Sequence, residues 1–148
     1  MLTRKFGEIE VDSNKILVMS DGLPGFTGFE KFVLLEDPKT DPFCWFQSIE
    51  EPNLALVVMS PFLFKPDYQL ELDEFRDNYG WDTPVDELIV YVVVNITEKE
   101  AVTKITANLM GPLIINPKKN EVVQVVFSDT AYSHQHNVLE SLDTLPGE

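Results

Sequence analysis

The order of hydrophobic and polar residues along the chain is typical of a protein built from many short β-strands. The strongest signal is residues 88–94, Leu-Ile-Val-Tyr-Val-Val-Val, because β-branched and aromatic side chains favour extended backbone. Residues 54–58 are almost wholly apolar, which predicts a strand covered on both faces. Further runs predict strands at residues 3–11, 15–19, 31–35, 43–49, 54–59, 102–107, 113–115 and 122–127, the first two paired as a hairpin.

Turn residues separate these runs and indicate the fold class. Residues 21–28 hold three glycines and a proline, which predicts an ordered loop. Residues 50–53 have the length of a hairpin connection. Residues 116–120 predict a turn with Lys118 and Lys119 at its exposed tip. Many short strands between such turns predict an all-β, mainly antiparallel, barrel-like fold.

The other predicted elements are one short helix and a C-terminal region without a clear hydrophobic pattern. Asp73 offers an N-cap and Gly80 a stop, so we expect a helix over about residues 73–79. After Ser128 the pattern fades, and we expect a flexible tail from about residue 130 onward, with a weak helix as the alternative for the last ten residues. Composition is uniform and no linker appears, so residues 1–148 are expected to form a single domain.

The net charge of the chain disfavours some classes of binding partner and favours others. The chain has 25 acidic and 11 basic residues, a net charge of −14. Nucleic acids and anionic membranes are bound through Lys and Arg, so direct binding to either is disfavoured. A basic protein partner is favoured, although the same acidity can serve solubility alone. The chain shows no signal-peptide core and no apolar run near the roughly 20 residues of a membrane helix, so we expect a cytoplasmic protein.

The chain contains residue types that often serve catalysis or metal binding, but their sequence context does not fit those functions. Cys44 lies inside the apolar run 43–46, which favours a buried, inert thiol. His134 and His136 would face one side of a strand and could share a metal, but no third ligand can be assigned, so surface histidines are favoured. No serine lies in a nucleophile elbow, and residues 22–28 lack the Lys-Ser or Lys-Thr of a phosphate loop. We therefore expect no catalytic residue, no cofactor and no metal.

Half of the excess negative charge lies between residues 66 and 88. This stretch holds eight acids and one base, Arg76. It predicts a docking face for a cationic partner, and the alternative is an ordinary solvated helix and loop. The acids assigned to this predicted face are Asp67, Glu71, Asp73 and Glu74.

Large hydrophobic side chains come together in residues 61–68, Pro-Phe-Leu-Phe-Lys-Pro-Asp-Tyr. Exposed rings here would form a patch that monomeric proteins rarely present without a function. The alternative is that they fill the core, and we expect about half of them to do so. The candidate partner-binding residues in this block are Phe62, Leu63, Phe64 and Tyr68.

Three blocks of unusual residues follow one another in a specific order. They are residues 22–26 (Gly-Leu-Pro-Gly-Phe), 62–68 (Phe-Leu-Phe-Lys-Pro-Asp-Tyr) and 106–116 (Thr-Ala-Asn-Leu-Met-Gly-Pro-Leu-Ile-Ile-Asn). Together they resemble the signatures of the flagellar assembly factor FliW family, over roughly residues 4–136. One departure is Gln-His-Asn at residues 135–137, where the family often has Arg-His-Pro.

The resemblance implies a small, single-domain β protein of the bacterial cytoplasm with two protein partners. One is CsrA, an RNA-binding translational regulator, which the family sequesters so that repression of flagellin mRNA is relieved. The other is flagellin, which the family binds as a chaperone-like partner and which competes with CsrA. Two rivals stay open: a small hydrolase with an acidic cleft, recognisable by two converging carboxylates in a pocket, and a structural barrel subunit.

Overall fold

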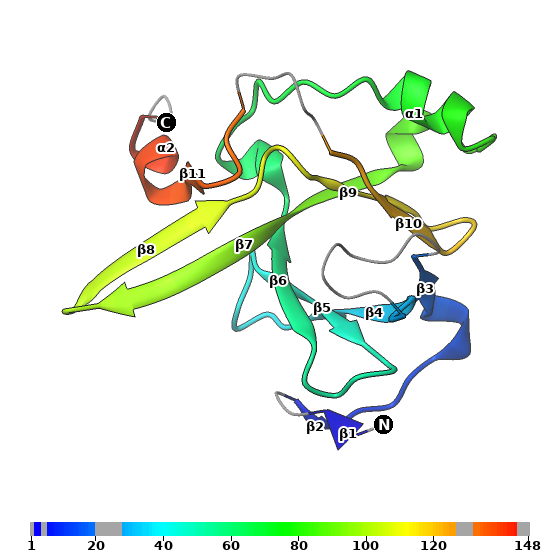
Figure 1. Ribbon diagram of the computed structural model, residues 1–148, viewed down its shortest axis with the longest axis horizontal. Coiled ribbons are helices and arrows are strands. Elements are labelled where there is room, and N and C mark those ends of the chain that lie inside the picture. The colour runs from blue at the N-terminus through cyan, green and yellow to red at the C-terminus, as the bar shows by residue number, and fades with distance from the viewer. Residues whose placement is uncertain (1, 4–5, 20–27, 127–131, 145–148) are drawn as a thin grey trace.

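The computed structural model describes residues 2–3, 6–19, 28–126 and 132–144, and most of its strands belong to one large sheet (Figure 1). Short helical segments lie at the ends of the sheet. The strands are β1 (Leu2–Thr3), β2 (Gly7–Glu8), β3 (Leu17–Val18), β4 (Lys31–Glu36), β5 (Cys44–Ser48), β6 (Ala55–Met59), β7 (Ile89–Lys99), β8 (Val102–Ala107), β9 (Leu113–Asn116), β10 (Glu121–Gln124) and β11 (His136–Asn137). The helical segments are η1 (Ser13–Lys15), η2 (Pro61–Leu63), α1 (Leu72–Asn78), η3 (Val85–Glu87) and α2 (Val138–Thr144).

The large sheet closes on itself into a ring of hydrogen bonds. Its strand order is β11-β8-β7-β6-β5-β4-β3-β10-β9, and β9 pairs again with β7. The pair β3–β10 is parallel, and the other described pairs are antiparallel. The predicted all-β, mainly antiparallel fold class is confirmed.

Hydrophobic clusters lie on both faces of the central strands. In β6, Leu56 and Val58 join a cluster supplied by β3, β4, β5, β9 and β10, where Phe32 and Phe46 stack with ring centroids 4.4 Å apart. Met59, whose side chain points to the opposite face of β6, joins a second cluster that lies beneath η2, β8 and α2. The apolar run 54–58 is therefore covered on both faces, as its composition predicts.

The N-terminal hairpin predicted from residues 3–11 and 15–19 is wrong. β1 pairs with β2, whereas β3 pairs with β4 and with β10. The Asp12 carboxylate accepts a hydrogen bond from the backbone N–H of Asn14 at 2.9 Å and begins η1, which takes the place of a hairpin turn. β10 is distant in sequence and residues 19–30 separate β3 from β4, so the local pattern could not identify either partner.

The strand predicted at residues 88–94 continues to Lys99 as the first arm of the β7–β8 hairpin. Glu100 and Ala101 form its two-residue turn with φ of 53° and 63°, the left-handed geometry that matches the twist of a hairpin. This hairpin extends away from the ring (Figure 1), so its outer residues are exposed on both faces and carry no hydrophobic periodicity.

The predicted helix is present as α1, one residue earlier than expected. Its N-cap is Glu71, which makes no side-chain capping bond, and not Asp73. Gly80 ends it with φ of 67°, as predicted. The N–H groups of Gly80 and Trp81 return to the carbonyls of Asp77 and Arg76, so the helix closes with a Schellman motif.

Some sequence expectations concern residues that the structure does not describe. The first motif block, residues 22–26, lies outside the described residues, as does most of the predicted loop 21–28 and Phe127. Within the described part of the chain, no helix is long and apolar enough to cross a membrane.

Candidate partner-binding site

The apolar block at residues 61–68 has two faces. Phe62 and Leu63 lie on η2 with 42% and 48% of their surfaces exposed. Phe64 and Tyr68 lie in the second hydrophobic cluster and are only 1% and 5% exposed. The expectation that about half of these side chains are buried is confirmed. Phe64 and Tyr68 are therefore corrected from contact residues to core residues, because a buried ring cannot meet a partner.

The second and third motif blocks meet at Tyr68. Its hydroxyl donates a hydrogen bond to the backbone oxygen of Leu109 at 2.5 Å, and burial raises the pKa of Tyr68, so the phenol keeps its proton. Leu109 is fully buried in the same cluster as Phe64. At Gly111, a Cβ would come within 2.8 Å of the Gln124 amide nitrogen and displace its hydrogen bond to the Gly111 carbonyl. The Tyr68 hydrogen bond and the shared cluster hold the second motif block against the third, and the Gln124 hydrogen bond holds Gly111 to β10.

The C-terminal elements cover the same cluster beside η2. β11 pairs with β8, Val138 of α2 is buried, and the His136 ring stacks on Phe64 with centroids 5.6 Å apart. The His136 ring also hydrogen-bonds the Ser141 hydroxyl. Residues 132–144 thus differ from the flexible tail expected there, because a buried valine and a strand pair hold them to the sheet.

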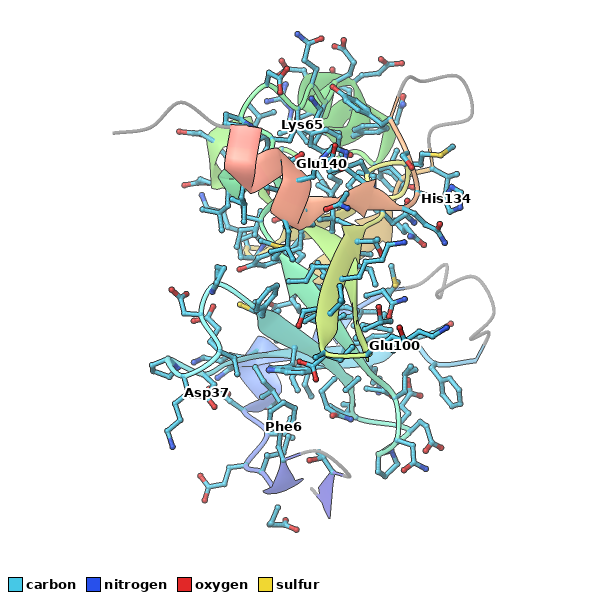
Figure 2. The ribbon with its side chains drawn as sticks, turned by 90° about the vertical axis from the view of Figure 1, so that its left-hand side faces the viewer. Phe6, Asp37, Lys65, Glu100, His134 and Glu140 are labelled. Carbon is cyan, nitrogen blue, oxygen red and sulfur yellow. The ribbon has the colours of Figure 1, made fainter. Side chains whose placement is uncertain are left out.

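The two histidines near the C-terminus do not form a pair. His134 lies exposed in a turn, whereas His136 belongs to β11 (Figure 2). Burial and the nearby Lys65 lower the pKa of His136, and Glu140 opposes this effect. His136 is therefore neutral at pH 7 and serves the packing of this segment.

The predicted acidic residues differ in how far their charge is neutralised. Asp67 lies 3.1 Å from Lys65 Nζ, and this contact lowers the pKa of Asp67. Asp73 lies 3.7 Å from Arg76 on the exposed face of α1. Glu71 and Glu74 are also exposed on this helix, and within the described part of the chain no cation pairs with either.

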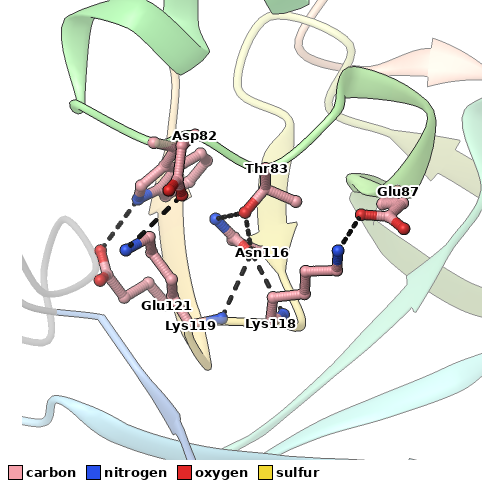
Figure 3. Close-up of polar contacts among 8 residues, drawn as sticks. Asp82, Thr83, Glu87, Asn116, Lys118, Lys119 and Glu121 are labelled. Atoms are coloured by element: carbon pink, nitrogen blue, oxygen red, sulfur yellow. Dashed lines mark hydrogen bonds and ion pairs between the residues drawn. The ribbon is translucent and has the colours of Figure 1, made fainter.

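The turn between β9 and β10 brings two lysines to the acidic stretch (Figure 3). Lys118 pairs with Glu87 at 2.8 Å, and Lys119 lies 3.9 Å from Asp82. Lys118 and Lys119 are exposed, as predicted, but they are not free. They reduce the local excess of negative charge that the sequence suggested, whereas Glu71 and Glu74 keep no ion pair among the described residues.

Buried Asn116 holds this turn in place. Its amide donates to the Thr83 hydroxyl at 3.0 Å, and its side-chain oxygen accepts from the backbone N–H groups of Lys118 and Lys119 at 3.2 and 3.3 Å (Figure 3). Asn116 is fully buried. One side chain therefore couples the turn to the acidic segment that precedes η3.

Sequence reasoning missed an acidic cleft of about 680 Å³ beside η2. Its walls come from the β4–β5 connection, from Ser60 and Leu63 at η2, and from Tyr91 of β7. Its carboxylates belong to Glu36, Asp37 and Asp41. These segments meet only because β4, β5, β6 and β7 are paired side by side, and no local pattern contains that information.

The acidic cleft lacks the features that acid–base catalysis requires. Glu36 and Asp41 are exposed to solvent and are not held in the apolar surroundings that tune a catalytic carboxylate. Among the described residues, no group of three or more His, Cys, Asp and Glu side chains is arranged to hold a metal ion.

Comparison with solved structures assigns the fold to a class of flagellar assembly proteins. The crystal structure of a flagellar assembly factor FliW matches with a TM-score of 0.80 and 31% sequence identity, covering 93% of this chain and 95% of that chain. The model of the FliW protein family matches residues 1–138. The chain belongs to the FliW family.

Curated relatives agree over almost their whole length. A flagellar assembly factor FliW of Treponema denticola is 40% identical over 142 residues, covering 95% of this chain and 94% of the relative. One of Caldanaerobacter subterraneus is 38% identical over 141 residues, covering 95% and 93%. These relatives are named assembly factors and not enzymes, which supports a role in flagellar assembly.

Proposed function

We propose that this protein is a cytoplasmic flagellar assembly factor that acts by binding two other proteins. It binds the RNA-binding regulator CsrA and so relieves repression of flagellin mRNA. It also binds flagellin as a chaperone-like partner, and newly made flagellin displaces CsrA. Membership of the FliW family supports this role, and the two partners follow from the resemblance of the three motif blocks.

The observation that carries the proposal is the exposure of Phe62 and Leu63 on a rigid support. A short helix held by the buried Phe64 and Tyr68 presents both side chains to solvent. Exposed apolar side chains on a pre-ordered surface lose little conformational entropy when a partner covers them. Such a surface suits the amphipathic ends expected of unassembled flagellin.

The acids of α1 supply an electrostatic role toward the basic regulator. Glu71, Asp73 and Glu74 are exposed near the start of the helix. A docked acidic surface attracts Lys and Arg and repels RNA phosphates over about one Debye length, roughly 8 Å at physiological salt. RNA binding is then opposed without any need to fill the RNA groove.

Replacing Phe62 and Leu63 with serine tests the apolar contact. We expect the double variant to bind purified flagellin about tenfold or more weakly in titration calorimetry, because two exposed anchors are lost. The matched control is the Ile96→Ser, Val102→Ser variant on the β7–β8 hairpin, where the replaced side chains are 42% and 66% exposed. Unchanged flagellin affinity in the η2 variant, or equal weakening in the control, contradicts the proposed contact.

A further inference from the structure

The acidic cleft beside η2 shares Leu63 with the proposed apolar contact and is otherwise a separate surface. It lies between the β4–β5 connection and η2 and encloses about 680 Å³. Leu63 lies at its edge and is 48% exposed. Its remaining apolar lining comes from Pro38, Pro42 and Phe43. The cleft therefore offers apolar contact area together with carboxylates.

The loop that forms one wall is ordered by its own hydrogen bonds. The Asp37 carboxylate accepts from the N–H of Lys39 at 2.9 Å, and the Asp37 carbonyl accepts from the N–H of Thr40 at 3.0 Å. The Thr40 hydroxyl and carbonyl both contact the backbone of Phe43. A wall that is already folded keeps its shape when a ligand binds, which reduces the entropic cost of binding.

The charge of the cleft has one sign. Among the described lining residues, Glu36, Asp37 and Asp41 are ionisable acids and none is a lysine or arginine. No ion pair joins these acids to a cation in the described part of the chain. Burial and the neighbouring Cys44, with a smaller contribution from Glu36, raise the pKa of Tyr91, which lines the cleft, to about 12. The cleft favours cations and disfavours anions.

A smaller hollow of about 230 Å³ adjoins the cleft and shares Glu36, Asp37 and Pro38 with it. It is also lined by Phe6 and Trp45, whose rings meet edge to face at 5.5 Å. Trp45 pairs with Leu35, whereas Cys44 of the cleft pairs with Glu36. Because successive side chains of a strand point to opposite faces, the hollow around Trp45 is separate from the cleft.

We propose that this cleft binds a segment of a partner protein in which lysine or arginine alternates with aliphatic residues. The aliphatic side chains contact Leu63 and Phe43, and the cations lie against Glu36 and Asp41. The inference rests on the proposed function in requiring a protein partner, and it adds a binding surface distinct from the acids of α1.

The test uses the full chain and a synthetic probe, the acetylated and amidated hexapeptide Leu-Lys-Leu-Lys-Leu-Lys. Amide NMR shifts are followed on titration of the ¹⁵N-labelled protein, with Gly-Lys-Gly-Lys-Gly-Lys as the probe that keeps charge and lacks aliphatic side chains. We expect shifts at residues 36–45, 60–63 and 91, and weaker binding of the glycine probe. The E36Q/D41N variant is expected to bind the leucine probe about fivefold more weakly.

The matched control removes the same charge elsewhere. The E98Q/E100Q variant changes two exposed acids at the tip of the β7–β8 hairpin and is expected to bind like the unmodified protein. Shifts centred on α1 or spread over the surface, or unchanged affinity of a folded E36Q/D41N variant, overturn the proposal. Because the probe is not a natural partner, failure of CsrA or flagellin to bind would contradict the proposed function and leave this result intact.

Discussion

At the scale of single residues, identical side chains two positions apart have opposite roles. Phe62 is exposed on η2, whereas Phe64 fills the second hydrophobic cluster against His136. The sequence predicts that some rings of this block are buried and others exposed. It cannot predict which, because the short 3₁₀ turn of η2 sets their direction and the local pattern has no clear period.

Replacing Phe64 with alanine is expected to destabilise the protein far more than replacing Phe62. The buried ring leaves a cavity, so Phe64→Ala should lower the free energy of unfolding by about 3–5 kcal/mol. The exposed Phe62→Ala should cost less than about 1 kcal/mol. Urea denaturation of the two variants and the unmodified chain measures both values. Similar losses would place the two rings in similar surroundings and contradict the assigned packing.

At the scale of elements, the sequence predicted most strands but not their partners. The 43–59 hairpin was correctly predicted with residues 50–53 as its connection, and both strands of the 88–107 hairpin were predicted without their pairing. β3 was found as a strand but assigned the wrong partner, because residues 19–30 separate it from β4 and β10 lies far along the chain. α2 was expected only as a weak helix and β11 was missed, because their packing depends on Val138, on the pairing of β11 with β8 and on the contact of His136 with Phe64.

The β9–β10 turn depends on Asn116 in a way that one substitution tests. Asn116→Ala leaves the Thr83 hydroxyl and two backbone N–H groups without their partner. We expect a loss of about 1–3 kcal/mol in the free energy of unfolding, measured by urea denaturation. The control Asn95→Ala, at an exposed position of β7, should change stability by less than about 0.5 kcal/mol. Equal effects would show that the buried hydrogen bonds do not hold the turn.

At the scale of the whole molecule, folding brings together charged residues that are far apart in the sequence. Lys118 and Lys119 neutralise part of the acidic stretch, and residues 36–41 form an acidic cleft that composition alone did not indicate. The fold class could be predicted because it depends on local patterns. The ring closure and the cleft could not, because each joins segments separated by many residues.

Reversing the charge of α1 should slow the encounter with the basic regulator. We expect the Glu71→Lys, Glu74→Lys variant to associate with purified CsrA about tenfold more slowly at low salt, with the difference shrinking as salt is added. Stopped-flow fluorescence measures the association rate. The control Glu98→Lys, Glu100→Lys makes the same change in net charge at the tip of the β7–β8 hairpin, away from α1 (Figure 1). Equal slowing in both variants would mean that net charge, and not a face of α1, governs the encounter.

The packing of α2 beside η2 bears on how the protein is best handled. His136 stacks on Phe64 directly after η2, and Lys65 and Glu140 both act on this histidine, so the last described helix lies next to the exposed Phe62 and Leu63. β1 lies at the other end of the molecule (Figure 1). An affinity handle or fluorophore fused after the final helix would crowd the surface that is to be assayed, whereas one fused before β1 leaves it open for capture on a sensor chip.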